Sequence, residues 1–144
     1  MPFIFEENIR DATLLLQNVA AELQTEDLNK AGRIFRAVLQ SIRDRLPVHD
    51  AIQFAAQLPT LWKGIYFDQY EPHKVPVTIR DSNDWINYIR SKNAFAADND
   101  FQQDEEISAS FQAVFRVLQR TMPEDHLLKV KESLKEHLQE LLPA

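Results

Sequence analysis

The chain has 144 residues, of which 44% are hydrophobic and 26% are charged, and its formal net charge is −6 at pH 7. This length and composition fit one globular domain with a substantial core. The absence of cysteine excludes disulfides, thiolate metal sites and a cysteine nucleophile. The acidic balance argues against nucleic acid as a partner, because nonspecific binding requires that Lys and Arg neutralise phosphates.

Nothing in the sequence directs the chain to a membrane. No apolar run reaches the roughly 18 residues that a spanning helix needs. The first residues, Met1-Pro-Phe-Ile-Phe-Glu-Glu, lack the positively charged start of a secretory signal. We therefore expect a cytoplasmic protein that does not contact a membrane.

Apolar residues spaced three or four apart predict helices in the first half of the chain. A first helix carries on one stripe Ile9, Ala12, Leu16, Val19 and Leu23. A second helix, which Thr25 is placed to cap, carries a stripe from Leu28 to Leu46. Pro47 and Pro59 interrupt the pattern, and each is expected to begin a further helix because proline is tolerated at a first helical position.

The second half shows a similar pattern after an interruption. Residues 68–82 hold two prolines and several β-branched residues without a helical period, which predicts an extended linker. Three helices follow, around Trp85, over 104–122 and over 124–141. We expect the last helix to run straight, because it has no proline at the position equivalent to Pro59.

The two halves of the chain are related by a shift of 76 residues. Among the identical pairs that the shift superposes are Phe35 on Phe111, Pro47 on Pro123 and Leu58 on Leu134. The identical pairs are core-type residues or the helix-breaking proline, which favours a duplicated three-helix unit over chance. We predict an all-α fold in which two tandem pseudo-repeats of about three helices each pack as one domain. The predicted boundaries are 1–144 for the domain, 1–67 for the first repeat, 68–82 for the linker and 83–144 for the second repeat.

Three segments of the chain resemble a known bacterial family. They are Asp44 to Ala51, Ala56 to Phe67 and, after the linker, Asp84-Trp85. The family is called domain of unknown function 2267, and the resemblance extends roughly from Val19 to Pro143. It implies tandem helical halves in a bacterial protein and supplies no established activity. At Lys63 and Tyr70 the chain departs from the residues usual in the family, so the resemblance implies no functional site.

The residue types that enzyme sites need do not form a pattern in this chain. With Gly32 and Gly64 as its only glycines, the chain has neither a phosphate-binding loop nor a nucleophile elbow. His49-Asp50 and Asp125-His126 occupy equivalent places in the two halves. They leave a paired metal site open, although solvated first helical turns explain them better. We therefore assign no catalytic, cofactor-binding or metal-binding residue, expect no cofactor and lean against an enzyme.

Four aromatic residues fall within nine positions at the junction of the halves. The candidate interaction patch consists of Trp62, Lys63, Tyr66, Phe67 and Tyr70. The rings either plug the seam between the repeats, which is the ordinary interpretation, or form an amphipathic surface of the type enriched in protein interfaces. Both interpretations hold together if some rings are buried and Tyr70 is exposed.

A weaker candidate is an anion contact on the second helix, where Arg33, Arg36 and Arg43 lie on one side. A solvated face that balances the acidic rest of the domain is the interpretation that we favour. The leading hypothesis for the function is a noncatalytic module that binds a protein partner or a second copy of itself. The alternative is an enzyme or small-ligand-binding protein with a pocket between the two halves, and nucleic acid is the least favoured partner.

Overall fold

The computed structural model describes residues 3–93, 100–101, 103–134 and 142. Within these residues it contains seven α-helices, one short 3-10 helix and no strand, packed around one core. The all-α fold class predicted from the sequence is thereby confirmed. The elements in chain order are α1 (Glu6–Leu23), α2 (Leu28–Arg45), α3 (Val48–Ala55), α4 (Thr60–Phe67), η1 (Pro72–Lys74), α5 (Ser82–Lys92), α7 (Asp104–Thr121) and α8 (Glu124–Ser133).

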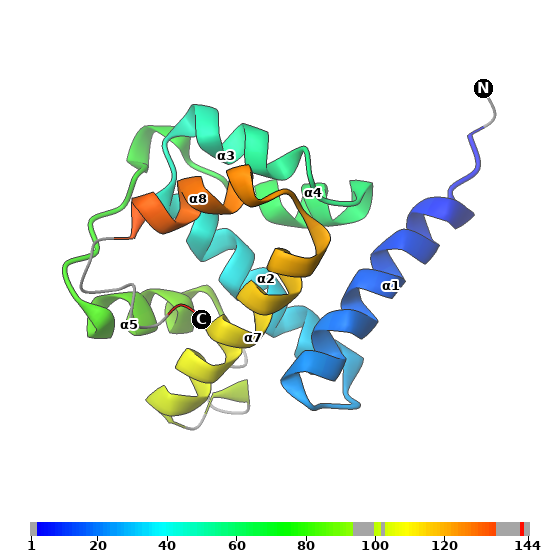
Figure 1. The fold of residues 1–144 in the computed structure, drawn as a ribbon, viewed down its shortest axis with the longest axis horizontal. Coiled ribbons are helices and arrows are strands. Elements are labelled where there is room, and N and C mark those ends of the chain that lie inside the picture. Colours follow the sequence, from blue (N-terminus) through cyan, green and yellow to red (C-terminus); the bar gives the residue numbers. More distant parts are fainter. Residues whose placement is uncertain (1–2, 94–99, 102, 135–141, 143–144) are drawn as a thin grey trace.

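Three helices of the first half have counterparts that begin 76 residues later. Helix α1 begins at Glu6 and its counterpart α5 at Ser82. In the same way, α2 begins at Leu28 and α7 at Asp104, and α3 begins at Val48 and α8 at Glu124. Helix α1 packs on α2 and α7, α5 packs on the same two helices, α2 contacts α7, and α3 contacts α8 (Figure 1). Reciprocal contacts of this kind indicate an approximate twofold relation between the halves. The boundaries of the two repeats at 1–67 and 83–144 stay a prediction.

The core is centred on α2 and α7, which have more buried residues than the other helices. Phe35 and Leu39 on α2 and Phe111 and Phe115 on α7 are fully buried. Trp85 of α5 packs edge-on against Phe111 with 5.5 Å between the ring centroids. Because burying one large apolar side chain stabilises a fold by roughly 1.5–3 kcal/mol, these rings make a major contribution to stability.

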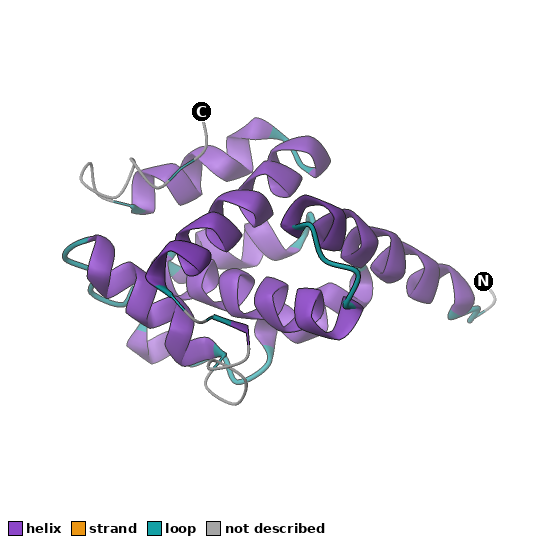
Figure 2. Cartoon of the chain, turned by 90° about the horizontal axis from the view of Figure 1, so that it is seen from below, coloured by secondary structure: helices purple, strands orange, loops and turns teal. Residues whose placement is uncertain are grey.

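Helix α1 packs on the domain along only part of its length. Val19 and Ala20 in its C-terminal half are buried, whereas Ile9 is 57% exposed. Figure 1 and Figure 2 both show the N-terminal part of α1 extending away from the other helices. We call residues Phe3 to Asp11 the α1 tip.

Two helix ends differ from the sequence prediction. Asp27, not Thr25, caps α2, because its side chain accepts a hydrogen bond from the Lys30 amide at 3.1 Å. Thr25 lies two residues too early, and its side chain accepts a hydrogen bond from the Asp27 amide instead. At the other end of the chain, α8 stops at Ser133 and Leu134 is extended, with φ −93° and ψ 123°. The prediction that the last helix runs straight through Leu134 is therefore wrong. Positions 135–141, over which the helix was also predicted, lie outside the described residues.

The segment that joins α4 to α5 packs on the domain. It contains η1, and the Val77 amide donates a hydrogen bond to the Asp44 carbonyl at 2.8 Å. Ile79 is buried, and Ser82, which we placed in the linker, is the first residue of α5. The connection therefore contributes to the packing of α2 in addition to linking the halves.

Candidate functional site

Two members of the candidate interaction patch lie in the core. Trp62 and Tyr66, four residues apart on α4, are both buried. The Trp62 ring lies 4.6 Å from the Phe35 ring between centroids, and its Nε1 donates to the Ala12 carbonyl at 3.0 Å. The Tyr66 hydroxyl donates to the Ala51 carbonyl at 2.8 Å. These side chains hold α4 against its neighbours and offer little surface to a partner.

The other three members, Lys63, Phe67 and Tyr70, are half-buried. The ring centroids of Phe67 and Tyr70 are 5.7 Å apart, and the Arg43 guanidinium lies 5.0 Å from the centroid of Tyr70. Burial raises the pKa of Tyr70, whose hydroxyl oxygen has no hydrogen-bond partner among the described residues. An interaction role for these three residues stays a prediction, and it involves a smaller exposed area than the whole patch.

The three arginines of the weaker anion-contact candidate have different surroundings. Arg33 binds Asp100 through two hydrogen bonds of 2.8 and 2.9 Å. Arg43 is fully buried, which corrects its placement on a solvated face. Arg36 is half-buried and has no hydrogen bond or ion pair within the described part of the chain. The guanidinium groups of Arg33 and Arg43 are therefore engaged in hydrogen bonds that stabilise the fold.

Arg43 is the centre of a buried polar cluster that we did not predict from the sequence. Its guanidinium donates to the carbonyls of Tyr66 and Asp68 at 2.8 and 2.9 Å, and to Asp44 Oδ1 at 2.7 Å. Arg43 lies eight residues after the buried Phe35, so it falls on the apolar stripe of α2. That position in the stripe was the available signal that this arginine is buried.

Asp44 ties α5 to α2 within the same cluster. Its carboxylate accepts from Arg43 and from the Tyr88 hydroxyl, and it pairs with Lys92 at 2.9 Å. Burial acts to raise the pKa of Asp44, but the hydrogen bonds from Arg43, Tyr88 and Lys92 outweigh it and hold this pKa below its usual value. Because the buried charges have opposite partners, we interpret the cluster as structural.

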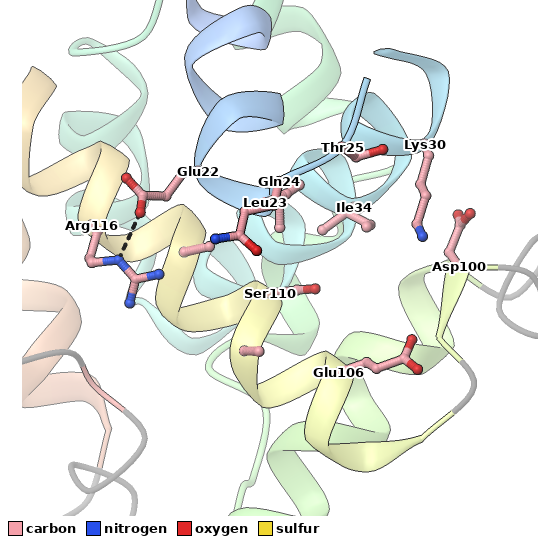
Figure 3. A pocket seen from close by; sticks show the side chains of 12 residues that line it. Glu22, Leu23, Gln24, Thr25, Lys30, Ile34, Asp100, Glu106, Ser110 and Arg116 are labelled. Carbon is pink, nitrogen blue, oxygen red and sulfur yellow. Dashed lines mark hydrogen bonds and ion pairs between the residues drawn. The ribbon is translucent and has the colours of Figure 1, made fainter. Parts of the chain in front are cut away.

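A pocket of about 400 Å³ opens between the two halves of the domain. Helix α1 and the turn after it contribute Leu23 and Gln24, α2 contributes Ile34, and α7 contributes Ser110 and Arg116. Figure 3 shows Arg116 and Lys30 on opposite sides of the pocket, with Ser110 between them. We call this the seam pocket, and its volume lies in the range of about 300–1,000 Å³ that small-molecule sites occupy.

Ion pairs surround the seam pocket. Glu22 accepts from Arg120 Nη1 at 2.6 Å and from Arg116 Nε at 3.1 Å, and these hydrogen bonds lower the pKa of Glu22. Since Glu22 belongs to α1 and both arginines to α7, the pairs join the two halves. Both oxygens of this carboxylate are already engaged.

Asp100 lines the same pocket and is engaged in the same way. It accepts from Arg33 and from Asn93 Nδ2 at 2.8 Å. The hydrogen bond from Arg33 lowers the pKa of Asp100 despite burial, which acts to raise it. Asp100 therefore stays ionised and is held by α2 and by the end of α5.

Replacing Asp100 by asparagine should reduce the acid sensitivity of the fold. A carboxyl whose pKa is lower when folded stabilises the protein above its unfolded value of about 3.9 and loses this contribution as pH falls through the folded pKa. We expect Asp100→Asn to lower the free energy of unfolding by about 1.5–3 kcal/mol near pH 6, and by less near pH 3. Urea unfolding at both pH values measures this. The exposed Asp125→Asn variant is the control, and an equal loss at both pH values would contradict the assignment.

The α1 tip is the second candidate site because it exposes large apolar side chains. Phe3 is 88% exposed, Phe5 is 63% exposed, and Ile4 and Ile9 are also exposed. Ile9 lies on the predicted stripe of the first helix, but nothing in the described structure covers it. Monomeric soluble proteins rarely expose contiguous apolar patches above a few hundred Å². The tip therefore has the character of an interaction surface.

In the described part of the chain, no helix is long and apolar enough to span a membrane. Within the same residues, no group of three or more histidine, aspartate or glutamate side chains could hold a metal ion.

Residues 13–141 match the model of the family described as "Uncharacterized conserved protein (DUF2267)". The chain belongs to this family. The resemblance inferred from the segments 44–51 and 56–67 is thereby confirmed, and the description of the family supplies no activity. No curated protein matches the chain. The seam pocket lies within the range matched to DUF2267, whereas the α1 tip precedes it.

Proposed function

We propose that the protein is a noncatalytic module that associates with a second copy of itself through the α1 tip. The observation that carries the proposal is the exposed stripe of Phe5 and Ile9. Phe5 precedes Ile9 by four residues, and Ile9, Leu16 and Leu23 follow at intervals of seven, so all four lie on the stripe that packs on the domain. The stripe continues beyond the domain without cover, as Figure 1 shows for the helix itself.

A second copy is a suitable occupant because the tip can pair with itself. In an antiparallel pair with its twofold axis close to Glu7, Phe5 of each copy meets Ile9 of the other. At about 100° per residue, Glu7, Arg10 and Asp11 lie more than 100° around the helix from Phe5, whereas Glu6 borders the stripe, about 60° from Ile9. Burying the stripe therefore leaves the first three charges in solvent and places Glu6 at the rim of the pair, which limits the desolvation that an interfacial charge would cost.

The tip is small beside the roughly 800 Å² per partner that a stable interface buries. We therefore expect a weak dimer with a dissociation constant in the micromolar range. Because the tip precedes the range matched to the family, self-association is proposed for this chain and not for DUF2267 as a whole. The cytoplasmic location, and a further contribution from Lys63, Phe67 and Tyr70, stay predictions.

Replacing Ile9 by serine should weaken self-association at least tenfold, because each copy would lose one apolar side chain from the pair. Sedimentation equilibrium across micromolar to millimolar concentrations measures this. Leu14→Ser is a matched control, since Leu14 lies on the same helix with the same 57% exposure but about 140° away from Ile9 around the axis. Wild-type protein that stays monomeric, or equal effects of the two variants, would contradict the proposal. Capture of an unrelated protein by a monomeric tip would assign the surface to that partner.

A second candidate function is the binding of a small molecule in the seam pocket. It is supported by the volume of about 400 Å³ and by the position of the pocket between the halves. Small-ligand sites commonly occupy such junctions between packed units. This candidate is independent of the α1 tip.

A further inference from the structure

The seam pocket contains polar groups that the fold leaves unused. The Lys30 ammonium, the Ser110 hydroxyl and the Gln24 side-chain amide have no hydrogen-bond partner among the described residues. Arg116 uses Nε for Glu22 and has no described partner for its two Nη groups. Ser110 is a buried residue of α7, so its hydroxyl has little access to solvent except through the pocket. Each of these groups can donate a hydrogen bond.

The carboxylates of the seam pocket, by contrast, are already in use. Both oxygens of Glu22 accept from arginines, and so do both oxygens of Asp100. Glu106, the third carboxylate of the lining, is not free either. A cationic ligand would have to displace existing ion pairs, whereas an anionic ligand would meet free donors.

The charges around the pocket balance one another. Arg33 and Arg120 hold Asp100 and Glu22 from just outside the lining, and Asp27 lies near Arg33. The four cations Lys30, Arg33, Arg116 and Arg120 are therefore matched by four carboxylates, and the acidic excess of the whole chain is absent at this site. Among these cations, Lys30 is the one without an ion pair in the described part of the chain.

The uncharged part of the lining fits an apolar body. Leu23 and Ile34 from the first half face Ala109 and Ala113 of α7 across the pocket. The small alanine side chains leave space that larger residues would fill. With Lys30 as the one lining cation that has no ion pair in the described part of the chain, and no glycine-rich loop to supply backbone amides, the pocket suits a single carboxylate better than a phosphate.

Gln24 stands at the rim in a backbone conformation that is costly for its type. It ends α1 with φ 60° and ψ 43°, the left-handed region where glycine or asparagine is usual. The capping hydrogen bonds of this turn, from the Gln24 amide to the Ala21 carbonyl and from the Thr25 amide to the Ala20 carbonyl, compensate for it. At this position the side-chain amide of Gln24 lines the pocket and can donate a hydrogen bond to a ligand.

From these observations we infer that the seam pocket binds a small organic carboxylate whose apolar body lies against Leu23, Ile34 and α7, with Lys30 as the cationic partner of its carboxylate. The inference rests on the second candidate function and is independent of self-association through the α1 tip.

The test uses hexanoate as the probe, with hexanol and hexylamine as analogues of the same body and inorganic phosphate as a second anion. Hexanoate is expected to bind the full chain saturably, with a dissociation constant on the order of 1 mM, as measured by NMR titration. The expected shifts include the amides of Gln24 and Ser110. Hexanol, hexylamine and phosphate should each bind at least tenfold more weakly.

Lys30→Gln should weaken hexanoate binding about fivefold to tenfold while circular dichroism shows an unchanged fold. Lys63→Gln is the matched control, because Lys63 is also a half-buried lysine but lies on α4 outside the pocket. Ile9→Ser should bind hexanoate as wild type does, which separates this test from that of self-association. No saturable binding, equal binding of hexanol or phosphate, or equal effects of the two lysine variants would overturn the inference.

Discussion

Replacing Arg43 by methionine is expected to lower the free energy of unfolding by roughly 3–5 kcal/mol. Methionine keeps an apolar stem but donates no hydrogen bond, so the buried carbonyls of Tyr66 and Asp68 lose their donors. Asp44 loses one of its three partners in the same step and becomes more costly to keep ionised. Urea unfolding monitored by circular dichroism measures the change.

Arg36→Met is the matched control for this prediction. Arg36 lies on the same helix, is half-buried and has no polar partner in the described part of the chain. Its replacement should change the free energy of unfolding by no more than about 0.5 kcal/mol. If both variants lost the same amount, Arg43 would not have the structural role that its hydrogen bonds indicate.

Trp85→Ala and Ile9→Ala should differ strongly although the two positions are equivalent in the two halves. Trp85 is buried against Phe111, so its truncation should cost about 3–5 kcal/mol. Ile9, 76 residues earlier, is exposed, and its truncation should cost no more than about 0.5 kcal/mol. The comparison requires dilute protein, because self-association would add to the apparent stability of the wild type.

The same pair of variants tests whether the α1 tip is free for a partner. A small effect of Ile9→Ala on the dilute protein means that the fold does not need the side chain. A loss comparable to that of Trp85→Ala would place Ile9 in the core and remove the basis of the proposed interface.

The helices were predictable because their apolar stripes and prolines are local features. Pro47 and Pro123 stand immediately before α3 and α8, and the shift of 76 residues in the sequence recurs in the helix starts. The end of α8 was not predictable from proline alone. In the first half, Leu58 is followed by Pro59. Its counterpart Leu134 is extended although no proline follows it.

The outcome for the aromatic segment depended on contacts that the sequence does not show. Trp62 and Tyr66 share a helix face by their spacing, but the approach of α1, α2 and α3 is what buries them. The burial of Arg43 was obscured by its charge, although its place on the apolar stripe of α2 agrees with the structure. Sequence patterns located these residues and did not determine their environment.

The two candidate sites differed in how much the sequence could reveal. The apolar residues of the α1 tip are visible in the sequence, but that they lie beyond the domain is a tertiary property. The seam pocket joins residues far apart in the chain, as the 94-residue separation of Glu22 and Arg116 illustrates. From the sequence we therefore expected a pocket between the halves only as an alternative, and no residue could be assigned to its lining.

Hydrogen–deuterium exchange of the wild-type protein at two concentrations tests the central claim most directly. In the dilute monomer, the amides of residues 6–11 should exchange rapidly, because this end of α1 lies outside the packed domain. At concentrations well above the dissociation constant, these amides should become protected while those around Val19 stay unchanged. Exchange that is the same at both concentrations throughout α1 would contradict self-association through the α1 tip.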